Sequence, residues 1–151
     1  MLLERLLVVG VRDDARARNL SNITVITADM NVFDPGTQFD RVVSVEMFEH
    51  MSNWRPLLTR IHGWLKPDGA LFLHVFTHQR RPSYYDPTSG EWMAKYFFTG
   101  GIMPSPGLIR MYTDLFAVAA EWRWSGANYR RTANHWLENF DANRAAIDPI
   151  L

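Results

Sequence analysis

Two carboxylates and an imidazole stand close together in residues 45–51, which read VEMFEHM. If the chain turns into a helix after the hydrophobic strand that precedes this segment, Glu46, Glu49 and His50 lie on one face. A carboxylate beside an imidazole suits proton abstraction, because the carboxylate orients the ring and raises its basicity. The same spacing also fits a solvated helix start, where acidic side chains favour the positive end of the dipole. The spacing leaves both interpretations open.

A further histidine, His74, lies within a run at residues 70–76 that is otherwise apolar. Its imidazole therefore needs a hydrogen-bond partner or stays neutral. A satisfied core histidine explains it, and so does a functional histidine near the end of a strand. No metal site is indicated, because the segment at 45–51 has no second histidine at ligand spacing and the chain has no cysteine.

Alternating strands and helices predict how these side chains are positioned. We expect helices at residues 13–20 and 53–65 and strands at residues 23–27, 41–45 and 70–76. The helix at 53–65 carries its apolar residues at steps of three and four, as an amphipathic helix does. Strand, helix and strand joined by short turns predict a parallel sheet covered by helices, in which ligands bind beyond the carboxyl ends of the strands. We therefore expect Asp29, residues 46–50 and residues 74–78 to meet at one edge.

The second half of the sequence is less regular. It predicts helices at residues 91–98, 108–115 and 132–147 and a strand at residues 117–124. The first of these helices is rich in aromatic residues and is followed by Gly100 and Gly101. An aromatic helix is most often core, but a glycine hinge suits a lid, and aromatic faces stabilise cations by about 0.5 to 2 kcal/mol. We expect an aromatic helical lid or insert over about 79–115.

Composition limits the class of protein. The 151 residues carry 16 basic and 16 acidic side chains, so the net charge is zero, which argues against a nucleic-acid partner. Hydrophobic residues make up 47% of the chain, enough for one globular domain. The absence of cysteine excludes disulfides, thiolate metal sites and cysteine nucleophiles, and it suits a cytoplasmic location. No apolar run approaches the roughly 20 residues that cross a bilayer.

Five segments resemble a known family: residues 25–30, 39–51, 64–78, 91–105 and 128–139. They are similar to S-adenosylmethionine-dependent methyltransferases of the cyclopropane-fatty-acid synthase and coclaurine N-methyltransferase group. The most specific signals are EMFEHM at 46–51 and YFFTGG at 96–101, and both favour the N-methyltransferase-like branch. The resemblance runs from about Ala15 nearly to the end of the chain. It implies an α/β, Rossmann-like class I methyltransferase fold, with a partial parallel sheet and flanking helices.

The resemblance also implies a cofactor, S-adenosylmethionine, and a set of residues that bind it. Asp29 and Met30 match the positions that hold the adenine in the family. Val45 and Glu46 follow a strand and match the wall beside the methionine part of the cofactor. These four residues are the predicted cofactor-binding set.

The acceptor implied by the resemblance is a small amine or a lipid. Glu49 and His50 match the pair that acts on the amine in N-methyltransferases, so N-methylation is the first expectation. In the cyclopropane synthases the counterparts of Glu49, His74 and Tyr129 hold a bicarbonate that serves as base, which makes methylene transfer to an unsaturated phospholipid the alternative. Tyr129 follows Asn128 here, where the synthases usually place histidine. Peripheral membrane contact by the aromatic lid stays open.

One departure from the family concerns the ends of the chain. Family members have a first strand that ends in a glycine-rich loop, a second strand that binds the ribose, and a last strand after the helix of Trp136. No GxG occurs in this sequence, and Gly10 is a lone glycine. We therefore expect residues 1–151 to form a single, incomplete methyltransferase domain that lacks the first strands and the last strand. A non-catalytic remnant that binds cofactor poorly is a third interpretation.

Overall fold

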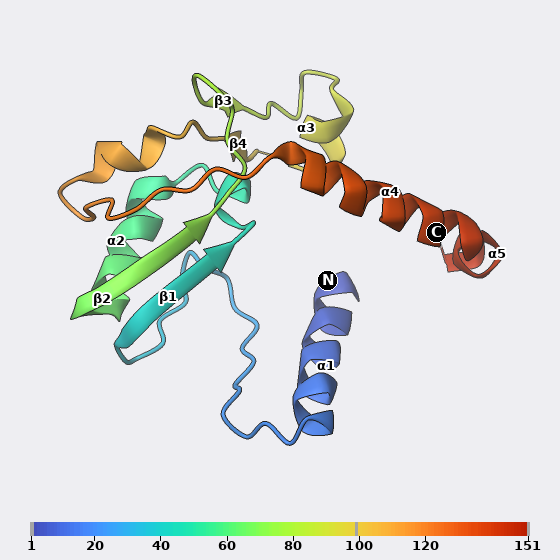
Figure 1. Ribbon diagram of the computed structural model, residues 1–151, viewed down its shortest axis with the longest axis horizontal. Helices are drawn as coiled ribbons and strands as arrows, with labels where there is room; N and C mark the ends of the chain where they lie inside the picture. Colours follow the sequence, from blue (N-terminus) through green and yellow to red (C-terminus); the bar gives the residue numbers. More distant parts are fainter. Residues whose placement is uncertain (1, 99, 151) are drawn as a thin grey trace. The chain divides into compact units, whose positions relative to one another are not determined.

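The computed structural model describes residues 2–98 and 100–150. The chain divides into two compact units, Met1–Ala117 and Val118–Leu151 (Figure 1). Thr99 belongs to the YFFTGG motif and lies outside the described residues, as do the two terminal residues. The expectation of one domain over 1–151 stays a prediction.

The first unit contains most of the regular structure. Its elements are α1 (Leu2–Ala17), β1 (Phe39–Val45), the 3-10 turn η1 (Phe48–His50), α2 (Trp54–Trp64), β2 (Leu65–His74), β3 (Ser83–Tyr84), α3 (Trp92–Tyr96), β4 (Ile102–Met103) and the 3-10 turn η2 (Leu108–Tyr112). The second unit contains α4 (Gly126–Ala142), α5 (Arg144–Ile147) and the 3-10 turn η3 (Asp148–Ile150).

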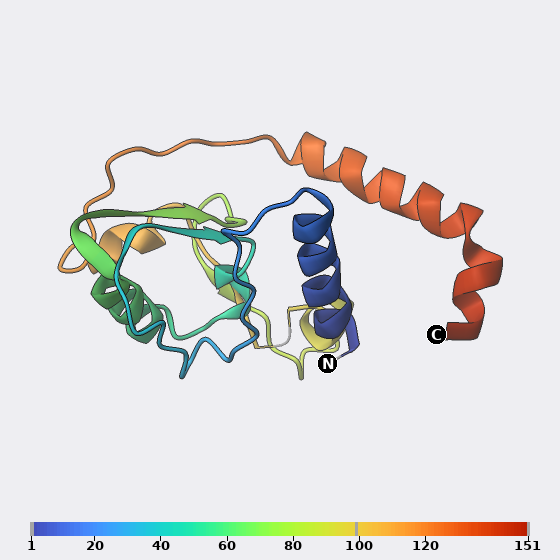
Figure 2. The same cartoon turned by 90° about the horizontal axis from the view of Figure 1, so that it is seen from below.

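The centre of the first unit is a strand, helix and strand repeat. β1 and β2 pair in parallel, with Val42 opposite Leu71 and Val45 opposite His74. The chain passes between them through α2, which lies against the sheet, as Figures 1 and 2 show. The parallel arrangement predicted from the sequence is confirmed for these two strands, and it brings their carboxyl ends together.

The core of this unit lies between α2 and the sheet. Its buried members are Phe48, Trp54, Leu57, Leu58, Ile61 and Leu65. Four of them recur along α2 at steps of three and four residues, so the helix buries one stripe and leaves the other to solvent. The side chains of the sheet that pack on this stripe include Val42, Leu71 and Leu73. The predicted amphipathic helix at 53–65 is therefore confirmed, one residue shorter at each end.

The opposite face of the sheet is exposed within the first unit. Val43 and Val45 alternate with the inward-facing residues of β1 and are 65% and 55% exposed, and Phe72 on β2 is 39% exposed. Alternation along a strand places every second side chain on the same face. Helices cover both faces of most parallel sheets. Here α2 covers one face, and these three apolar side chains lie on the other.

Two predicted strands are wrong. Residues 23–27 and 117–124 have no regular secondary structure, although both are rich in the branched or aromatic residues that strands favour. A strand exists only where its backbone pairs with another, and the parallel sheet in the described part of the chain consists of β1 and β2 alone. High strand propensity without a partner strand leaves these segments outside both sheets of the described residues.

The remaining elements are close to expectation, with shifted ends. α1 begins well before the predicted helix at 13–20, and η2 replaces the predicted helix at 108–115 by a shorter 3-10 turn. α4 begins at Gly126, where the Ser125 hydroxyl accepts a hydrogen bond of 3.2 Å from the Ala127 N–H, as a helix N-cap does. The predicted helix at 132–147 is interrupted at Asn143, which separates α4 from α5.

The segment predicted as a lid contains little regular structure. β3 and β4 form a short antiparallel pair, with Tyr84 opposite Ile102, and α3 lies in the chain between them. α3 covers five residues of the predicted helix at 91–98. The role of residues 79–115 as a lid stays a prediction.

Candidate active site

The chain makes a sharp turn at Glu46, directly after β1. Glu46 has a φ of +55°, in the left-handed region that residues with a side chain rarely adopt, and its N–H donates a 3.0 Å hydrogen bond to the carbonyl of His74. The 3-10 turn η1 begins two residues later. The expectation that Glu46, Glu49 and His50 share one helix face is therefore wrong, because the helix starts only after Glu46.

The turn brings Glu46 to His74. Oε1 of Glu46 lies 3.1 Å from Nδ1 of His74, so the two side chains form an ion pair when the imidazole is protonated. Both side chains are about one third exposed. The contact exists because Val45 and His74 are partners at the end of the parallel ladder. The predicted meeting of the two segments at one edge of the sheet is confirmed by this pair.

Glu49 points into the protein interior. It is 1% exposed, and its Oε2 has no hydrogen-bond partner among the described residues. Burial raises the pKa of the Glu49 carboxyl, and the negative charge of nearby Glu46 raises it further, while a backbone hydrogen bond and the imidazoles of His50 and His74 act in the opposite direction. A buried carboxyl with a raised pKa is a stronger base once ionised than one in water, which suits proton transfer.

Gly101 holds a second segment against the turn that carries Glu49. A Cβ at position 101 would overlap the carbonyl oxygen of Glu49 and would lie 3.1 Å from the Phe98 carbonyl oxygen. The Gly101 N–H donates a 2.7 Å hydrogen bond to that same Phe98 carbonyl. The glycine therefore lets the chain before β4 pass directly over η1. This close approach gives the second glycine of the YFFTGG motif a structural role.

Several aromatic rings lie close to His50. The ring centroid of His50 lies 5.2 Å from that of Phe98 and 6.1 Å from that of Phe97, and Tyr85 stacks on Phe98 at 4.6 Å. We call His50, Tyr85, Phe97 and Phe98 the aromatic cluster. Burial raises the pKa of the Tyr85 hydroxyl, with smaller contributions from the negative charges of Glu91 and Glu49, so Tyr85 stays neutral and can donate a hydrogen bond.

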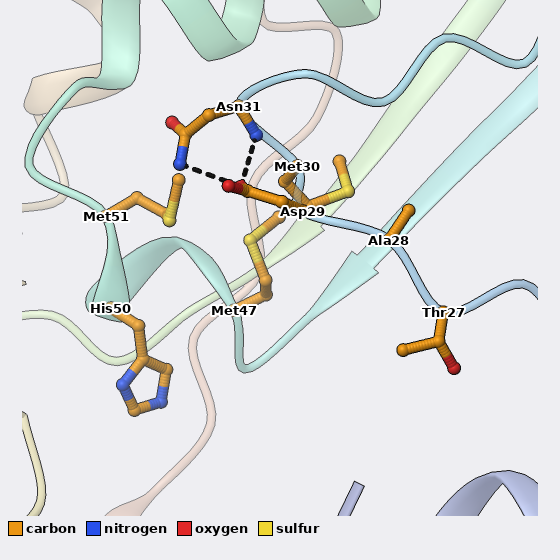
Figure 3. A pocket seen from close by; sticks show the side chains of 8 residues that line it. All are labelled: Thr27, Ala28, Asp29, Met30, Asn31, Met47, His50 and Met51. Atoms are coloured by element: carbon orange, nitrogen blue, oxygen red, sulfur yellow. Dashed lines mark hydrogen bonds between the residues drawn. The ribbon is translucent and has the colours of Figure 1, made fainter. Parts of the chain in front are cut away.

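A cavity of about 540 Å³ lies beside His50 (Figure 3). Its lining residues are Thr27, Ala28, Asp29, Met30, Asn31, Met47, His50 and Met51. A volume of this size falls within the range of about 300 to 1,000 Å³ that small-molecule sites occupy.

The chemistry of this cavity fits an adenine. Met30, Met47 and Met51 are among its lining residues, and methionine thioethers make favourable contacts with aromatic rings. Asp29 supplies a carboxylate, and a carboxylate accepts a hydrogen bond from an exocyclic amine. The lining residues are of a kind that suits the purine end of S-adenosylmethionine, and the adenine-binding role of Asp29 and Met30 stays a prediction.

The structure brings several of the predicted residues together. Asp29, Met30 and His50 line the cavity, and Glu49 neighbours His50 in the chain but is buried. Val45 and Glu46 are not among the lining residues of this cavity, so their predicted place beside the cofactor's methionine part stays a prediction. Tyr129 lies on α4 in the second unit, and its predicted meeting with Glu49 and His74 also stays a prediction.

Sequence reasoning missed five of the lining residues: Thr27, Ala28, Asn31, Met47 and Met51. Met47 and Met51 flank η1, and a methionine in such a segment gives no signal by itself, because it is as common in a core as in a site. Asn31 could have been found: an aspartate followed two residues later by an asparagine at the end of an apolar run is typical of a side-chain-bonded turn.

The fold and this site define the class of protein. The sequence matches the family described as mycolic acid cyclopropane synthetase over residues 12–150. The chain therefore belongs to this family of S-adenosylmethionine-dependent methyltransferases.

Two groups of curated relatives are similar to the chain. It is 35% identical over 143 residues to "(S)-coclaurine N-methyltransferase" of Thalictrum flavum subsp. glaucum, covering 93% of this chain and 40% of that protein. A protein of the same name from Papaver somniferum is 35% identical over 135 residues, covering 87% of this chain and 38% of that one. The "Cyclopropane-fatty-acyl-phospholipid synthase" of Escherichia coli strain K12 is 32% identical over 142 residues, with 88% and 36% covered.

A solved structure agrees with these matches. The crystal structure of coclaurine N-methyltransferase bound to N-methylheliamine and S-adenosylhomocysteine superposes with a TM-score of 0.83 at 34% identity, over 93% of this chain and 41% of that one. The mixed α/β fold described above is thus part of the class I methyltransferase fold. The chain spans about 40% of the length of the first curated relative. Across residues 2–98 and 100–150, no helix is long and apolar enough to span a membrane.

Proposed function

We propose that this chain carries the acceptor-side and adenine-side residues of an S-adenosylmethionine-dependent N-methyltransferase for a small amine. The observation that carries the proposal is the position of Glu49 and His50 on one 3-10 turn, with Glu49 buried and His50 lining the cavity that fits an adenine. Identity of 35% to two proteins named as coclaurine N-methyltransferases supports an amine as acceptor. The cytoplasmic location stays a prediction.

The residues of the turn serve the nitrogen of the acceptor. When bound, S-adenosylmethionine supplies a methyl group on a cationic sulfur, and the carbon–sulfur bond breaks as the amine lone pair forms the new carbon–nitrogen bond. Glu49 and His50 accept the proton that leaves this nitrogen, directly or through one water. The aromatic rings beside His50 stabilise the amine while it is cationic.

A second candidate acceptor is an unsaturated phospholipid. It is favoured by 32% identity to a protein named cyclopropane-fatty-acyl-phospholipid synthase. Glu49 and His74 of the first unit would then help to hold a bicarbonate as base. The two candidates differ in product, because one forms a new carbon–nitrogen bond and the other forms a ring on an acyl chain.

The test is methyl transfer by the 151-residue chain from methyl-labelled S-adenosylmethionine to a panel of primary, secondary and benzylic amines. We expect product with an amine, and we expect Glu49→Gln to lower kcat by about 100-fold or more, as removal of a general base does. Glu138→Gln makes the same chemical change at an exposed position on α4 and should behave as the parent.

Three outcomes would count against the proposal. Label found in extracted phospholipid and absent from amines would favour the lipid candidate. Amine methylation that is equal in the parent and in Glu49→Gln would remove Glu49 as the base. Transfer to no acceptor, together with no calorimetric binding of S-adenosylhomocysteine, would make the chain a non-catalytic remnant.

A further inference from the structure

A relay of side-chain amides leads from the start of α2 to the cavity. The Nδ2 of Asn53 donates a 2.8 Å hydrogen bond to Oδ1 of Asn31, and the Nδ2 of Asn31 donates a 2.9 Å bond to Oδ1 of Asp29. The backbone N–H of Asn31 donates to the same Asp29 oxygen at 2.8 Å. Figure 3 shows the two bonds between Asn31 and Asp29. The carboxylate that lines the cavity is therefore held by two residues in series.

This relay settles which way the Asn31 amide points. An asparagine amide has one accepting end and one donating end, and only one orientation satisfies both neighbours. The Asp29 carboxylate can only accept, so Asn31 must turn its nitrogen to Asp29 and its oxygen to Asn53, which then donates to it. Both bonds to Asp29 fall on Oδ1, and among the described residues no hydrogen bond is made to Oδ2. Oδ2 thus remains available to a donor in the cavity.

The start of α2 is a firm anchor for this relay. Asn53 is the residue before α2, yet its side chain makes no capping hydrogen bond to the helix and bonds to Asn31 instead. Further along α2, Arg60 donates to the carbonyl of Phe33, and the rings of Phe33 and Trp64 meet edge to face at 5.7 Å. The loop at residues 29–33 is thus attached to the helix that carries the buried core.

We infer that Asn53 and Asn31 are positioning residues that orient the Asp29 carboxylate toward the exocyclic amine of the cofactor's adenine, and so set the preference for adenine over a purine with oxygen at that place. The inference rests on the proposed function only for the cofactor and not for the acceptor. Adenine carries a donor at this position, and hypoxanthine carries an acceptor there, which a carboxylate repels.

The experiment is calorimetric binding of two probes, S-adenosylhomocysteine and S-inosylhomocysteine, to the 151-residue chain. We expect the parent to prefer the adenine probe by about tenfold or more. Asn53→Asp keeps the size of the side chain and is an equally good residue for a helix start, so α2 is preserved. Its carboxylate cannot donate, however, so it repels the Asn31 side-chain oxygen and competes with Asp29 for the Asn31 side-chain nitrogen, which weakens the bond that holds Asp29. The preference should fall about five- to tenfold, mainly through weaker binding of the adenine probe.

Two further variants separate positioning from damage. Asn134→Asp makes the same change on exposed α4 and should leave both affinities as in the parent. Asn31→Ala should lose the preference to a similar degree, and adding Asn53→Asp to it should cost little more, because both act through one carboxylate. In the unliganded chain, hydrogen exchange at the backbone N–H of Asn31 should be faster in Asn53→Asp than in the parent.

The result that overturns the inference is an unchanged preference in Asn53→Asp, or an equal loss for both probes, which would mean general disturbance of the loop. A parent that binds neither probe, or binds both equally, overturns it as well. The probes contain no acceptor, so the outcome is independent of amine transfer. A chain that prefers the adenine probe but methylates no amine would defeat the proposed function and leave this inference standing.

Discussion

The two carboxylates of the EMFEHM motif, Glu46 and Glu49, differ in how deeply they are buried. Glu46 sits at the strand end, one third exposed and paired with His74, whereas Glu49 is buried with one oxygen unpartnered. The two residues are three positions apart, yet the left-handed turn at Glu46 sends them to different environments. Their chemistry differs accordingly, because a buried carboxyl holds its proton more tightly than one in water.

The raised pKa of Glu49 predicts how stability depends on pH. The folded state holds the proton at pH values where the unfolded chain, with a carboxyl pKa near 4.5, has released it. Ionisation of Glu49 therefore costs folding free energy as the pH rises above 4.5, and there is no such cost well below it. We expect Glu49→Gln to stabilise the fold by about 1 kcal/mol at pH 7.5 and to make little difference near pH 4.

Urea unfolding of the parent and of Glu49→Gln at the two pH values checks this prediction. The exposed variant Glu138→Gln is the control and should not show the pH-dependent difference. A Glu49→Gln chain that is less stable than the parent at pH 7.5 would contradict it. Together with the expected loss of transfer, a gain in stability would mark Glu49 as a residue kept for function at a cost to the fold.

At the scale of elements, the site depends on how β4 and η1 meet. η1 carries Glu49 and His50, and the chain before β4 crosses it at Gly101, where a methyl group has no room. The aromatic cluster is held by the same crossing, since Phe98 accepts the hydrogen bond of Gly101 through its carbonyl. A substitution at Gly101 should therefore disturb both Glu49 and the aromatic cluster.

We predict that Gly101→Ala destabilises the chain by about 1 to 3 kcal/mol, because the added methyl group must push apart two backbone segments. Gly107→Ala is the matched control: a Cβ there meets nothing within 4 Å, and the backbone φ of −80° suits alanine. Chemical denaturation of both variants measures the difference. Equal stability of Gly101→Ala and Gly107→Ala would show that the crossing is looser than described.

At the scale of the whole molecule, the chain consists of two units with different internal support. The first has a buried core between α2 and the sheet. The second has no buried residue in α4, α5 or η3, and Trp136 and Leu137 of α4 are 60% and 59% exposed. Residues 116–125, which include the boundary, have no regular secondary structure. Backbone without hydrogen-bonded pairing is the first to be reached by proteases.

Limited proteolysis should reflect this division. We expect trypsin to cut early after Arg123, which is exposed in the segment 116–125, while the bond after Arg60 in α2 stays intact because a core helix must unfold before it is cut. Mass analysis of the fragments locates the cuts, and Arg123→Gln should abolish the early one. Early cleavage within α2 would refute the division of stability.

The local pattern of apolar and polar residues in the sequence determined several structural features of this protein. The apolar steps of α2, the strand and helix repeat around it and the placement of Glu46 and His74 at one edge all follow from periodicity that neighbouring residues impose on the backbone. The motif at 46–51 pointed to the family, which the comparison over residues 12–150 confirms.

Tertiary structure decided what depends on partners distant in the sequence. Residues 23–27 have the composition of a strand but no pairing partner, so they stay unpaired, and no count of propensities reveals this. The burial of Glu49 depends on the segment at Gly101, which is distant in the sequence and crosses over η1. The relay from Asn53 to Asp29 joins a helix start to a loop. Strand pairing, desolvation and side-chain relays are set by non-local contacts, and only the folded chain brings those contacts together.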